Sequence, residues 1–479
     1  MDKFFKIKEN NSTVRTEIMA GLTTFFAMAY IVITNPNQIV SFNHLAEGAD
    51  PKFQMIWNAV YVASILGAFI GTMLMALYAK MPFAQACGMG LNSFFFVSFI
   101  LPQIEKIEKG ENGDLVLGYH YGMIVIFLSG ILFLLLTFTK AREKIAKALP
   151  DCLKKAIPAG IGLFIAFLGF QNVGIIQHNQ YTLVQFMDIH GAIESGAFKA
   201  TIVSALLALL GLLIIAILDQ LKVKGSVLIS ILAITVIYYP VTGTVPSFDM
   251  GQVGQSFKDF GEIGITGLFD SAAWKTAFGS GASAIFSTVV LIITYALVDM
   301  FDTIGTVYGT ASQAGMLDEN GDPKNLDKCM ASDSIATVVG GVAGTSTVTT
   351  FVESASGVGA GGRTGLTSLV VAICFFICLF LSPVASLVPA CATAPALIYV
   401  GVLMMKGFKE VDMTEARSAV PAFLALICMP LTYSISNGIG IGAIAYTLIT
   451  LFTGKYTKKD IAITIVAILF VLKFCMVTM

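Results

Sequence analysis

Three carboxylates lie inside strongly apolar stretches of this sequence, where a charged side chain is costly. Asp299 and Asp302 fall within the apolar segment 283–310, and Glu353 falls within the segment 346–361. A carboxylate at the centre of a transmembrane helix costs about 2.5–3.5 kcal/mol on insertion scales, so it usually faces a polar cavity and marks a path for substrate or protons. The alternative is that the acids only pair or hydrogen-bond between helices. Neither segment contains a Lys or Arg to pair them, which favours the transport interpretation.

The chain around Glu353 predicts a broken span. Glu353 follows TSTVTTFV (residues 345–352), a run of hydroxyl-bearing and β-branched side chains that favours extended backbone over helix. Ser354 and four glycines, the first of which is Gly357, follow it. Free backbone groups at such a break, and the N-terminus of the helix just after it, can face a ligand.

Polar residues on neighbouring segments extend this set. Asp299 and Asp302 are three positions apart and so share one helix face, with Thr306 one turn further along. Asp333 begins another apolar segment, where a helix cap explains it as well as a functional role does. All four histidines fall in predicted outer loops, so none is expected to relay protons.

Aromatic residues near the predicted breaks could stack on a flat ligand. Phe25, Phe26 and Tyr30 lie in the first apolar segment, while Phe83 and Phe351 flank two glycine-rich breaks. Packing or lipid contact is the alternative for each of them, because the chain has 36 phenylalanines in all.

The composition identifies the class of protein. Of 479 residues, 56% are apolar and 12% are charged, and the mean hydropathy is +0.82, which excludes a soluble globule and a disordered chain. The net charge of −1 gives no basic field for nucleic acid. Eight scattered cysteines form no CxxC pair, so neither a metal site nor a disulfide framework is expected, and no cofactor is expected either. The sequence is that of a membrane protein, and no cleaved signal peptide is expected at its polar N-terminus.

Apolar segments long enough to cross a bilayer, or to do so when broken, number fourteen. They cover residues 16–34, 56–78, 82–101, 121–139, 157–172, 199–219, 225–240, 283–310, 330–344, 346–361, 364–384, 388–405, 420–434 and 437–453. With the N-terminus inside, 22 Lys and Arg residues fall on the inner side and six on the outer side, as cytoplasmic loops require. The apolar stretch 460–478 could be an interfacial helix or a further span.

Two pairs of segments suggest an internal repeat. FAQACGMG (residues 83–90) resembles FVESASGVG (residues 351–359), and residues 158–170 resemble residues 395–408. Chance matching of apolar, glycine-rich strings could explain either pair alone. In both pairs the copies lie seven spans apart, and an odd offset means opposite orientation in the membrane. The prediction is an all-helical fold of seven plus seven inverted spans.

The first break carries supporting residues of its own. Gly88, Gly90 and Gly357 mark where the backbone is expected to unwind, and Gln85 is the hydrogen-bonding residue that matches Glu353. Asn92 follows closely, and its hydrogen bonds must be satisfied by protein or by ligand.

Several long motifs together resemble the adenine/guanine/hypoxanthine permease branch of the nucleobase–cation symporter-2 (xanthine/uracil permease) family. The motifs are GLTTFFAMAYI (21–31), GMGLN (88–92), DMFDTIGT (299–306), FVES (351–354), GGRTG (361–365) and PLTYSI (430–435). The resemblance implies proton-coupled uptake of purine bases, short strands in spans three and ten, and a homodimer in the cytoplasmic membrane with its N-terminus inside. The bilayer and a purine base with protons are then the partners.

The resemblance also implies a division into a core domain and a gate domain. The core domain comprises residues 1–140 and 283–385, the gate domain comprises 141–240 and 386–479, and an outer loop covers 241–282. Sliding of the core against the gate would be an elevator mechanism.

The resemblance assigns site residues by position. Asp302 and Glu353 match the two acids that contact the base in this family, and either of them or Asp299 could carry the proton. The strand-like backbone and rings around the breaks would supply the other contacts, from Phe26, Phe83, Ala84, Phe351, Val352, Ser354 and Thr306. Thr306 occupies the position where the related uracil carriers have a histidine. A proton-transfer step that uses this histidine therefore cannot be assigned to this sequence. Ser418 likewise stands where many members of this branch have an acid.

Three rival functions are weighed against purine import. An anion transporter of the same fold predicts a cationic site, whereas acids occupy the breaks. A channel is compatible with two acids, but no repeated filter motif is present. A membrane enzyme would need a nucleophile–base pair or a metal cluster, and the sequence shows neither.

Overall fold

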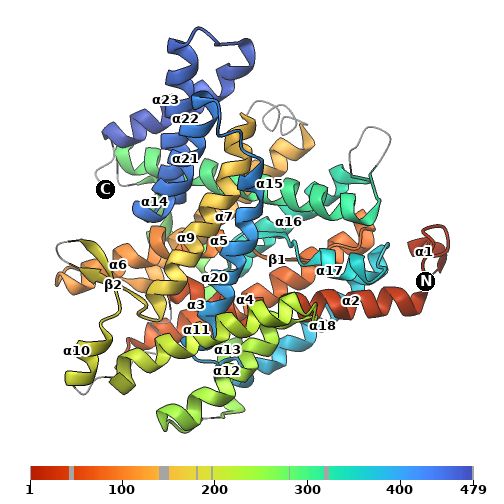
Figure 1. Cartoon of the computed structure of the whole chain (residues 1–479), viewed down its shortest axis with the longest axis vertical. Coiled ribbons are helices and arrows are strands. Elements are labelled where there is room, and N and C mark those ends of the chain that lie inside the picture. Colours follow the sequence, from red (N-terminus) through yellow and green to blue (C-terminus); the bar gives the residue numbers. More distant parts are fainter. Residues whose placement is uncertain are drawn as a thin grey trace.

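The structure is a computed structural model, and it describes residues 2–41, 48–139, 150–179, 182–195, 198–246, 248–279, 281–317 and 323–476. Helices make up most of the chain (Figure 1). The first half contains α1 (Asp2–Phe5), α2 (Val14–Met28), α3 (Ile31–Val40), α4 (Pro51–Leu74), β1 (Gln85–Cys87), α5 (Met89–Phe95), α6 (Leu101–Glu108), α7 (Leu115–Phe138), α9 (Asp151–Asn172), β2 (Ile176–Asn179), β3 (Leu183–Phe186), α10 (Ile189–Glu194), α11 (Phe198–Gln220) and α12 (Ser226–Thr242).

The second half continues the same pattern of helices with one short strand. It contains α13 (Gly251–Asp259), α14 (Ser271–Phe278), α15 (Ala282–Ala314), α16 (Leu326–Ala343), β4 (Val348–Thr350), α17 (Ser354–Gly359), α18 (Gly365–Cys378), α19 (Ser382–Ala385), α20 (Ala390–Met404), α21 (Ala416–Leu431), α22 (Ile435–Phe452) and α23 (Ile461–Met476). The junction between α2 and α3 matters for the site. Helix α2 ends at Met28, and backbone hydrogen bonds between residues three positions apart, from the Val32 N–H to the Ala29 carbonyl and from the Ile33 N–H to the Tyr30 carbonyl, join it to α3.

Among the described residues, nine helical stretches are long and apolar enough to cross a membrane. They cover residues 14–40, 51–79, 115–138, 151–172, 202–220, 282–308, 365–385, 390–410 and 435–452. The chain is therefore a multi-pass membrane protein. The remaining five predicted spans fall on shorter or interrupted elements: the β1–α5–α6 region, α12, α16, the β4–α17 region and α21.

The helices pack into two groups. In one, α2 and α4 pack against α18, and α16 packs against α4 and α7. In the other, α9 packs against α20 and α21, α11 packs against α12 and α20, and α21 packs against α22. Contacts between the groups are fewer and include those of α5 with α9 and of α15 with α23.

Two short strands far apart in the sequence pair at the centre of the first group. β1 and β4 run antiparallel, with Gln85 opposite Thr350, Ala86 opposite Thr349 and Cys87 opposite Val348. This confirms the expectation of short strands in the third and tenth predicted spans. Each strand is followed by a short helix, α5 or α17, so both breaks have the same strand-then-helix order.

Three parts of the structure differ from the expectations or extend them. The predicted outer loop 241–282 is largely helical, because α13 and α14 lie within it and pack against α4 and α7. His120, expected in an outer loop, lies inside α7. Within the stretch 460–478, residues 461–476 form α23, which packs against α22 and α15, and residues 477 and 478 lie outside the described part of the chain.

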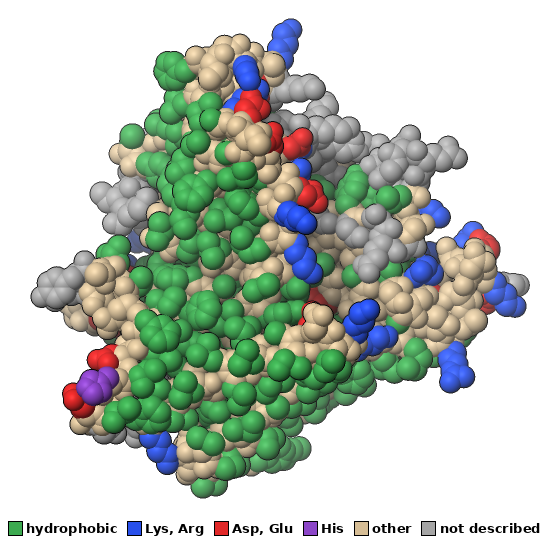
Figure 2. Space-filling view, viewed as in Figure 1, with side chains coloured by type: hydrophobic (Ala, Val, Ile, Leu, Met, Phe, Trp, Pro, Cys, Tyr) green, Lys and Arg blue, Asp and Glu red, His purple; other side chains and the backbone are tan. Residues whose placement is uncertain are grey.

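Hydrophobic side chains cover a broad continuous area of one face, while Lys and Arg side chains gather along its upper and right margins (Figure 2). Many large apolar residues of α11, α18 and α23 are correspondingly exposed, among them Leu213, Ile377 and Ile465. An exposed apolar surface of this extent is expected where protein meets hydrocarbon rather than water.

Candidate functional site

Backbone pairing between the two breaks builds the scaffold of the site. Beyond the β1–β4 ladder, the Phe351 N–H donates to the Ala84 carbonyl at 3.0 Å. The Ser354 hydroxyl accepts from the Ala84 N–H, also at 3.0 Å. The backbone segments that precede α5 and α17 are therefore hydrogen-bonded to each other, which fixes the backbone position of Glu353.

Glu353 stands at the end of the second break with one oxygen engaged and one not. The Tyr30 hydroxyl donates to Glu353 Oε1 at 2.7 Å, and Tyr30 lies at the α2–α3 junction with 1% of its surface exposed. Oε2 is buried and has no hydrogen-bond partner within the described structure. A buried acceptor left unpaired is costly, so this oxygen is a natural contact point for a ligand N–H or a proton.

Asp302 lies on α15, which packs against α17, the short helix that begins directly after Glu353. The structure thus places the two acids that the sequence singled out on neighbouring elements. No ion pair with a Lys or Arg is present for either acid among the residues described. The local charge balance favours a ligand that offers hydrogen-bond donors over an anion.

Asp333 is the centre of a buried network that joins α15, α16 and both strands. It accepts from the Thr303 hydroxyl at 2.6 Å, from Gln85 Nε2 at 3.0 Å and from the Thr350 hydroxyl at 3.3 Å. The interpretation of Asp333 as a helix cap at the membrane edge is wrong, because α16 begins seven residues earlier at Leu326. Gln85 is also held through its backbone, which exchanges hydrogen bonds with the Thr72 hydroxyl.

Asp299 is fully buried and only partly satisfied. The Thr337 hydroxyl donates to its Oδ2 at 2.7 Å, while Oδ1 has no partner in the described structure. Asp299 therefore makes the interhelical hydrogen bond that the alternative interpretation proposed, and it also keeps one oxygen for a proton or a water molecule.

Asn92 is satisfied by protein on both sides of its amide. Its Nδ2 donates to Gln38 Oε1 at 3.2 Å, and the Ser346 hydroxyl donates to its Oδ1. Of the two alternatives left open for Asn92, protein and ligand, the structure shows the first. Asn92 thus connects α5 to α3 and to the segment that leads into β4.

The aromatic and small residues expected at the site lie in different surroundings. Phe83 is fully buried in an apolar cluster with Val307 and Val358, and Phe351 is 7% exposed. Phe26 and Val352 are about half exposed, at 49% and 52%. Thr306 lies partly buried on α15, one turn beyond Asp302, as its spacing predicts.

The glycine-rich positions contribute through packing. Gly88 precedes α5 in extended conformation, but Gly90 and Gly357 lie inside short helices, so the expectation that the backbone unwinds at these two is wrong. The non-helical backbone lies just before each helix instead. A Cβ on Gly357 would clash with the Thr24 hydroxyl and the Ala20 carbonyl, so glycine is needed for α17 to pack against α2.

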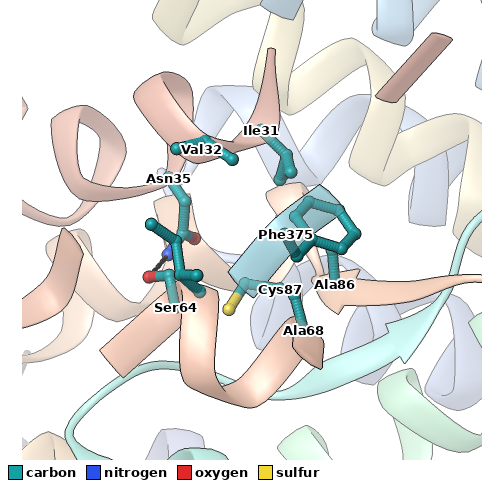
Figure 3. A pocket seen from close by; sticks show the side chains of 9 residues that line it. Ile31, Val32, Asn35, Ser64, Ala68, Ala86, Cys87 and Phe375 are labelled. Atoms are coloured by element: carbon teal, nitrogen blue, oxygen red, sulfur yellow. Dashed lines mark hydrogen bonds between the residues drawn. The ribbon is translucent and has the colours of Figure 1, made fainter. Parts of the chain in front are cut away.

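A small cavity lies beside the first break, between α3, α4, β1 and α18 (Figure 3). Mostly apolar side chains line it, and it has room for about one water molecule. Asn35 Nδ2 donates to the Ser64 hydroxyl, while Asn35 Oδ1 has no partner in the described chain. A purine base does not fit here. Within the described residues, no three His, Cys, Asp or Glu side chains are grouped to hold a metal ion.

Two important residues were missed or misjudged from sequence. The sequence suggests only stacking for the ring of Tyr30, and for Asp333 it leaves a helix cap and a functional role equally open. Their partners are 323 and up to 248 positions away in the chain, so only the tertiary structure reveals them.

A family of permeases matches most of the chain. Its model, described as a permease family and named for xanthine/uracil permeases, covers residues 15–441. The chain belongs to the xanthine/uracil permease family. The protein is accordingly a permease and not an enzyme.

Relatives of this permease are similar over their whole length. It is 35% identical to the adenine permease AdeQ of Escherichia coli, over 100% of this chain and 96% of that one. It is 37% identical to the guanine/hypoxanthine permease PbuG of Bacillus subtilis, over 95% of each chain. The transmembrane domain of a cyanobacterium bicarbonate transporter, BicA, has a similar fold, with a TM-score of 0.59 at 15% identity over 88% of this chain and 96% of that one.

Proposed function

We propose that this permease imports purine nucleobases, namely hypoxanthine, guanine or adenine, together with protons. The observation that carries the proposal is the Glu353 carboxylate, which lies at a strand break next to the helix that bears Asp302 and has a buried oxygen without a partner among the described residues. A purine offers several N–H donors. An ionised carboxylate accepts stronger hydrogen bonds from them than a neutral acceptor does. Similarity to adenine and guanine/hypoxanthine permeases over the full chain supports the same substrate class.

Proton coupling follows from the electrostatics of the same site. Several carboxylates are buried near one another without a neighbouring cation in the described structure, an arrangement whose cost falls when a proton is bound. Glu353, Asp302 and Asp299 are the candidate carriers of that proton. Binding of a base to a protonated site and release of both on the inner side would link the two fluxes.

The proposed architecture is fourteen spans in two inverted repeats of seven. The matching strand-then-helix order at β1–α5 and β4–α17 supports it, as does the direct packing of α9 on α20, the second pair of similar segments. The two groups of helices support the division into core and gate domains. An elevator movement of the core against the gate is then the simplest way to expose a site held by core residues to each side in turn.

The orientation and assembly are further parts of the proposal. The excess of Lys and Arg on one side of the predicted topology supports an N-terminus inside the cytoplasmic membrane. A homodimer is proposed from the resemblance alone, with lipid as the surrounding partner.

Uptake of radiolabelled bases by cells that lack their own carriers tests the proposal. Hypoxanthine, guanine or adenine should accumulate, uracil should not, and a protonophore should abolish accumulation. An anion transporter or a channel of the same fold is the alternative. Accumulation of sulfate or bicarbonate without any purine uptake would favour that alternative, although the acids at the site argue against it.

A further inference from the structure

The Tyr30–Glu353 hydrogen bond leaves the carboxylate with unequal oxygens. The phenol donates to Oε1 at 2.7 Å, whereas Oε2 is buried without a partner in the described structure. Both states of the carboxyl group keep this arrangement, because a protonated Glu353 would carry its proton on Oε2 and still accept from Tyr30 through Oε1. Rotation of the carboxyl group is therefore opposed whether or not a proton is bound.

The position of Tyr30 makes this restraint rigid. Tyr30 lies where α2 joins α3, the Thr34 hydroxyl donates to its carbonyl, and the whole residue is 1% exposed. A ligand that approaches Oε1 must compete with a buried phenol that already donates to this oxygen. Oε2 involves no such competition, since none of the described residues hydrogen-bonds to it.

We propose that Tyr30 determines base selectivity by limiting Glu353 to a single acceptor oxygen. This rests on the proposed function and adds to it a residue outside the two acids. A carboxylate with both oxygens free binds two adjacent N–H donors in a bidentate pair. Guanine offers such a pair, N1–H beside the exocyclic 2-amino group, whereas hypoxanthine has N1–H next to a C–H. With Oε1 occupied by the Tyr30 hydroxyl, the 2-amino group of guanine gains no additional hydrogen bond at Glu353. Guanine and hypoxanthine should then bind with similar affinity.

Tyr30→Phe tests the proposal because it removes the hydroxyl and keeps the ring. Freeing Oε1 adds one charge-assisted hydrogen bond for guanine and none for hypoxanthine, so the ratio of guanine to hypoxanthine affinity should rise about tenfold. The measurement is competition by unlabelled guanine and hypoxanthine against radiolabelled hypoxanthine uptake. A ratio within twofold of the wild type would overturn the proposal.

Tyr61→Phe is a matched control. Tyr61 is also a buried tyrosine of the first helix group, and its hydroxyl donates to the Cys378 carbonyl at 2.6 Å, away from Glu353. Removing it costs a similar hydrogen bond, so expression and thermal stability should fall comparably while the ratio of the two affinities stays unchanged. An equal change of ratio in both variants would assign the effect to general loosening and contradict the role of Tyr30.

The wild-type protein provides a second test that does not depend on the folding of a variant. Purified wild-type permease should bind guanine and hypoxanthine with affinities within about threefold of each other, and a preference for guanine above thirtyfold would overturn the proposal. Uptake of no purine at all by the wild type would contradict the proposed function itself. Uptake with an unaltered ratio in Tyr30→Phe would contradict only the role of Tyr30.

Discussion

The two strand breaks share a backbone design and differ in their chemistry. In the first, the side chain of Gln85 is fully buried and donates to Asp333 and Thr350, inside the helix group that holds it. In the second, Glu353 projects to Tyr30 and keeps one oxygen without a partner in the described structure. The residues are two positions after Phe83 and Phe351, so equivalent places in the proposed repeat carry an amide and an acid.

This difference gives the first break a structural role and the second break a role in ligand binding. The Gln85 amide joins α16 to the strand pair through its two donated hydrogen bonds, while its own Oε1, like Glu353 Oε2, is buried without a partner among the described residues. A carboxylate only accepts, so Glu353 is satisfied fully only when a donor comes from outside the protein. The first break thus completes the scaffold, and the second presents the ligand contact.

The largest expected effect is at the second break. Glu353→Gln replaces an anionic acceptor by an amide that also presents donors, and purine uptake should fall at least about 100-fold, which corresponds to losing a strong charge-assisted hydrogen bond. The measurement is radiolabelled hypoxanthine uptake normalised to protein in the membrane. Glu415→Gln is the control, since Glu415 is a partly exposed acid paired with Lys455, and its uptake should be normal. Normal uptake by Glu353→Gln would remove Glu353 from the site.

Asp302→Asn should also abolish uptake, because it removes the acid that shares the site with Glu353. Asp327→Asn, a change on the following helix near its start, is the comparison for general damage to this region. Both variants should reach the membrane in wild-type amounts. Transport by Asp302→Asn at the wild-type rate would limit the ligand contact to the second break alone.

At the first break the expected effect is on stability. Gln85→Leu removes the donor to Asp333 and leaves that buried carboxylate short of a partner, so the protein should lose about 1–3 kcal/mol. Thermal unfolding of the purified permease should show a lower Tm, while the relative affinities for the purine bases stay those of the wild type. A changed order of base preference with an unchanged Tm would reverse the assignment of the two breaks.

The smallest effect concerns an acid outside both breaks. Asp270 precedes α14, outside the membrane-spanning helices, and its Oδ2 lies 2.8 Å from His120 Nδ1. Partial burial pushes the pKa of Asp270 up, but hydrogen bonds from His120 and from the Ala272 N–H outweigh it and hold the pKa below its usual value. Asp270 therefore stabilises the fold above the pKa of an unfolded aspartate, and this contribution is lost as pH falls through the lower folded value.

Asp270→Asn should consequently lower Tm by a few degrees near neutral pH and leave purine uptake unchanged. The difference in Tm from the wild type should shrink as pH falls below about 4. A difference that stays constant down to acid pH would show that the charge of Asp270 is not what stabilises this segment.

Much of the scaffold could be predicted from the sequence. The apolar segments and the two breaks follow from composition and β-branched runs, rare acids in apolar segments single out Asp302 and Glu353, and the family resemblance assigns these two acids to one site. The structure gives a helix or strand within each predicted span, and the paired strands lie where the breaks were expected.

The parts that could not be predicted depend on tertiary contacts. Asp333 reads as an edge residue because nothing nearby shows that α16 starts at Leu326, and its partners come from three other elements. The phenol of Tyr30 meets Glu353 only because α2, α3 and α17 are folded together. The sequence predicts unwinding at Gly357, whereas the structure shows that this glycine allows α17 to pack closely on α2. Local sequence patterns identify polar residues that are costly to bury, but they do not show which partners form hydrogen bonds with them.

The most direct test of the central claim uses purified permease in liposomes with an imposed proton gradient, acid on the outside. Radiolabelled hypoxanthine should accumulate inside the wild-type vesicles, a protonophore should abolish the accumulation, and vesicles with Glu353→Gln should accumulate none. Accumulation that is insensitive to the protonophore, or equal in Glu353→Gln, would contradict the account of proton-coupled purine transport through Glu353.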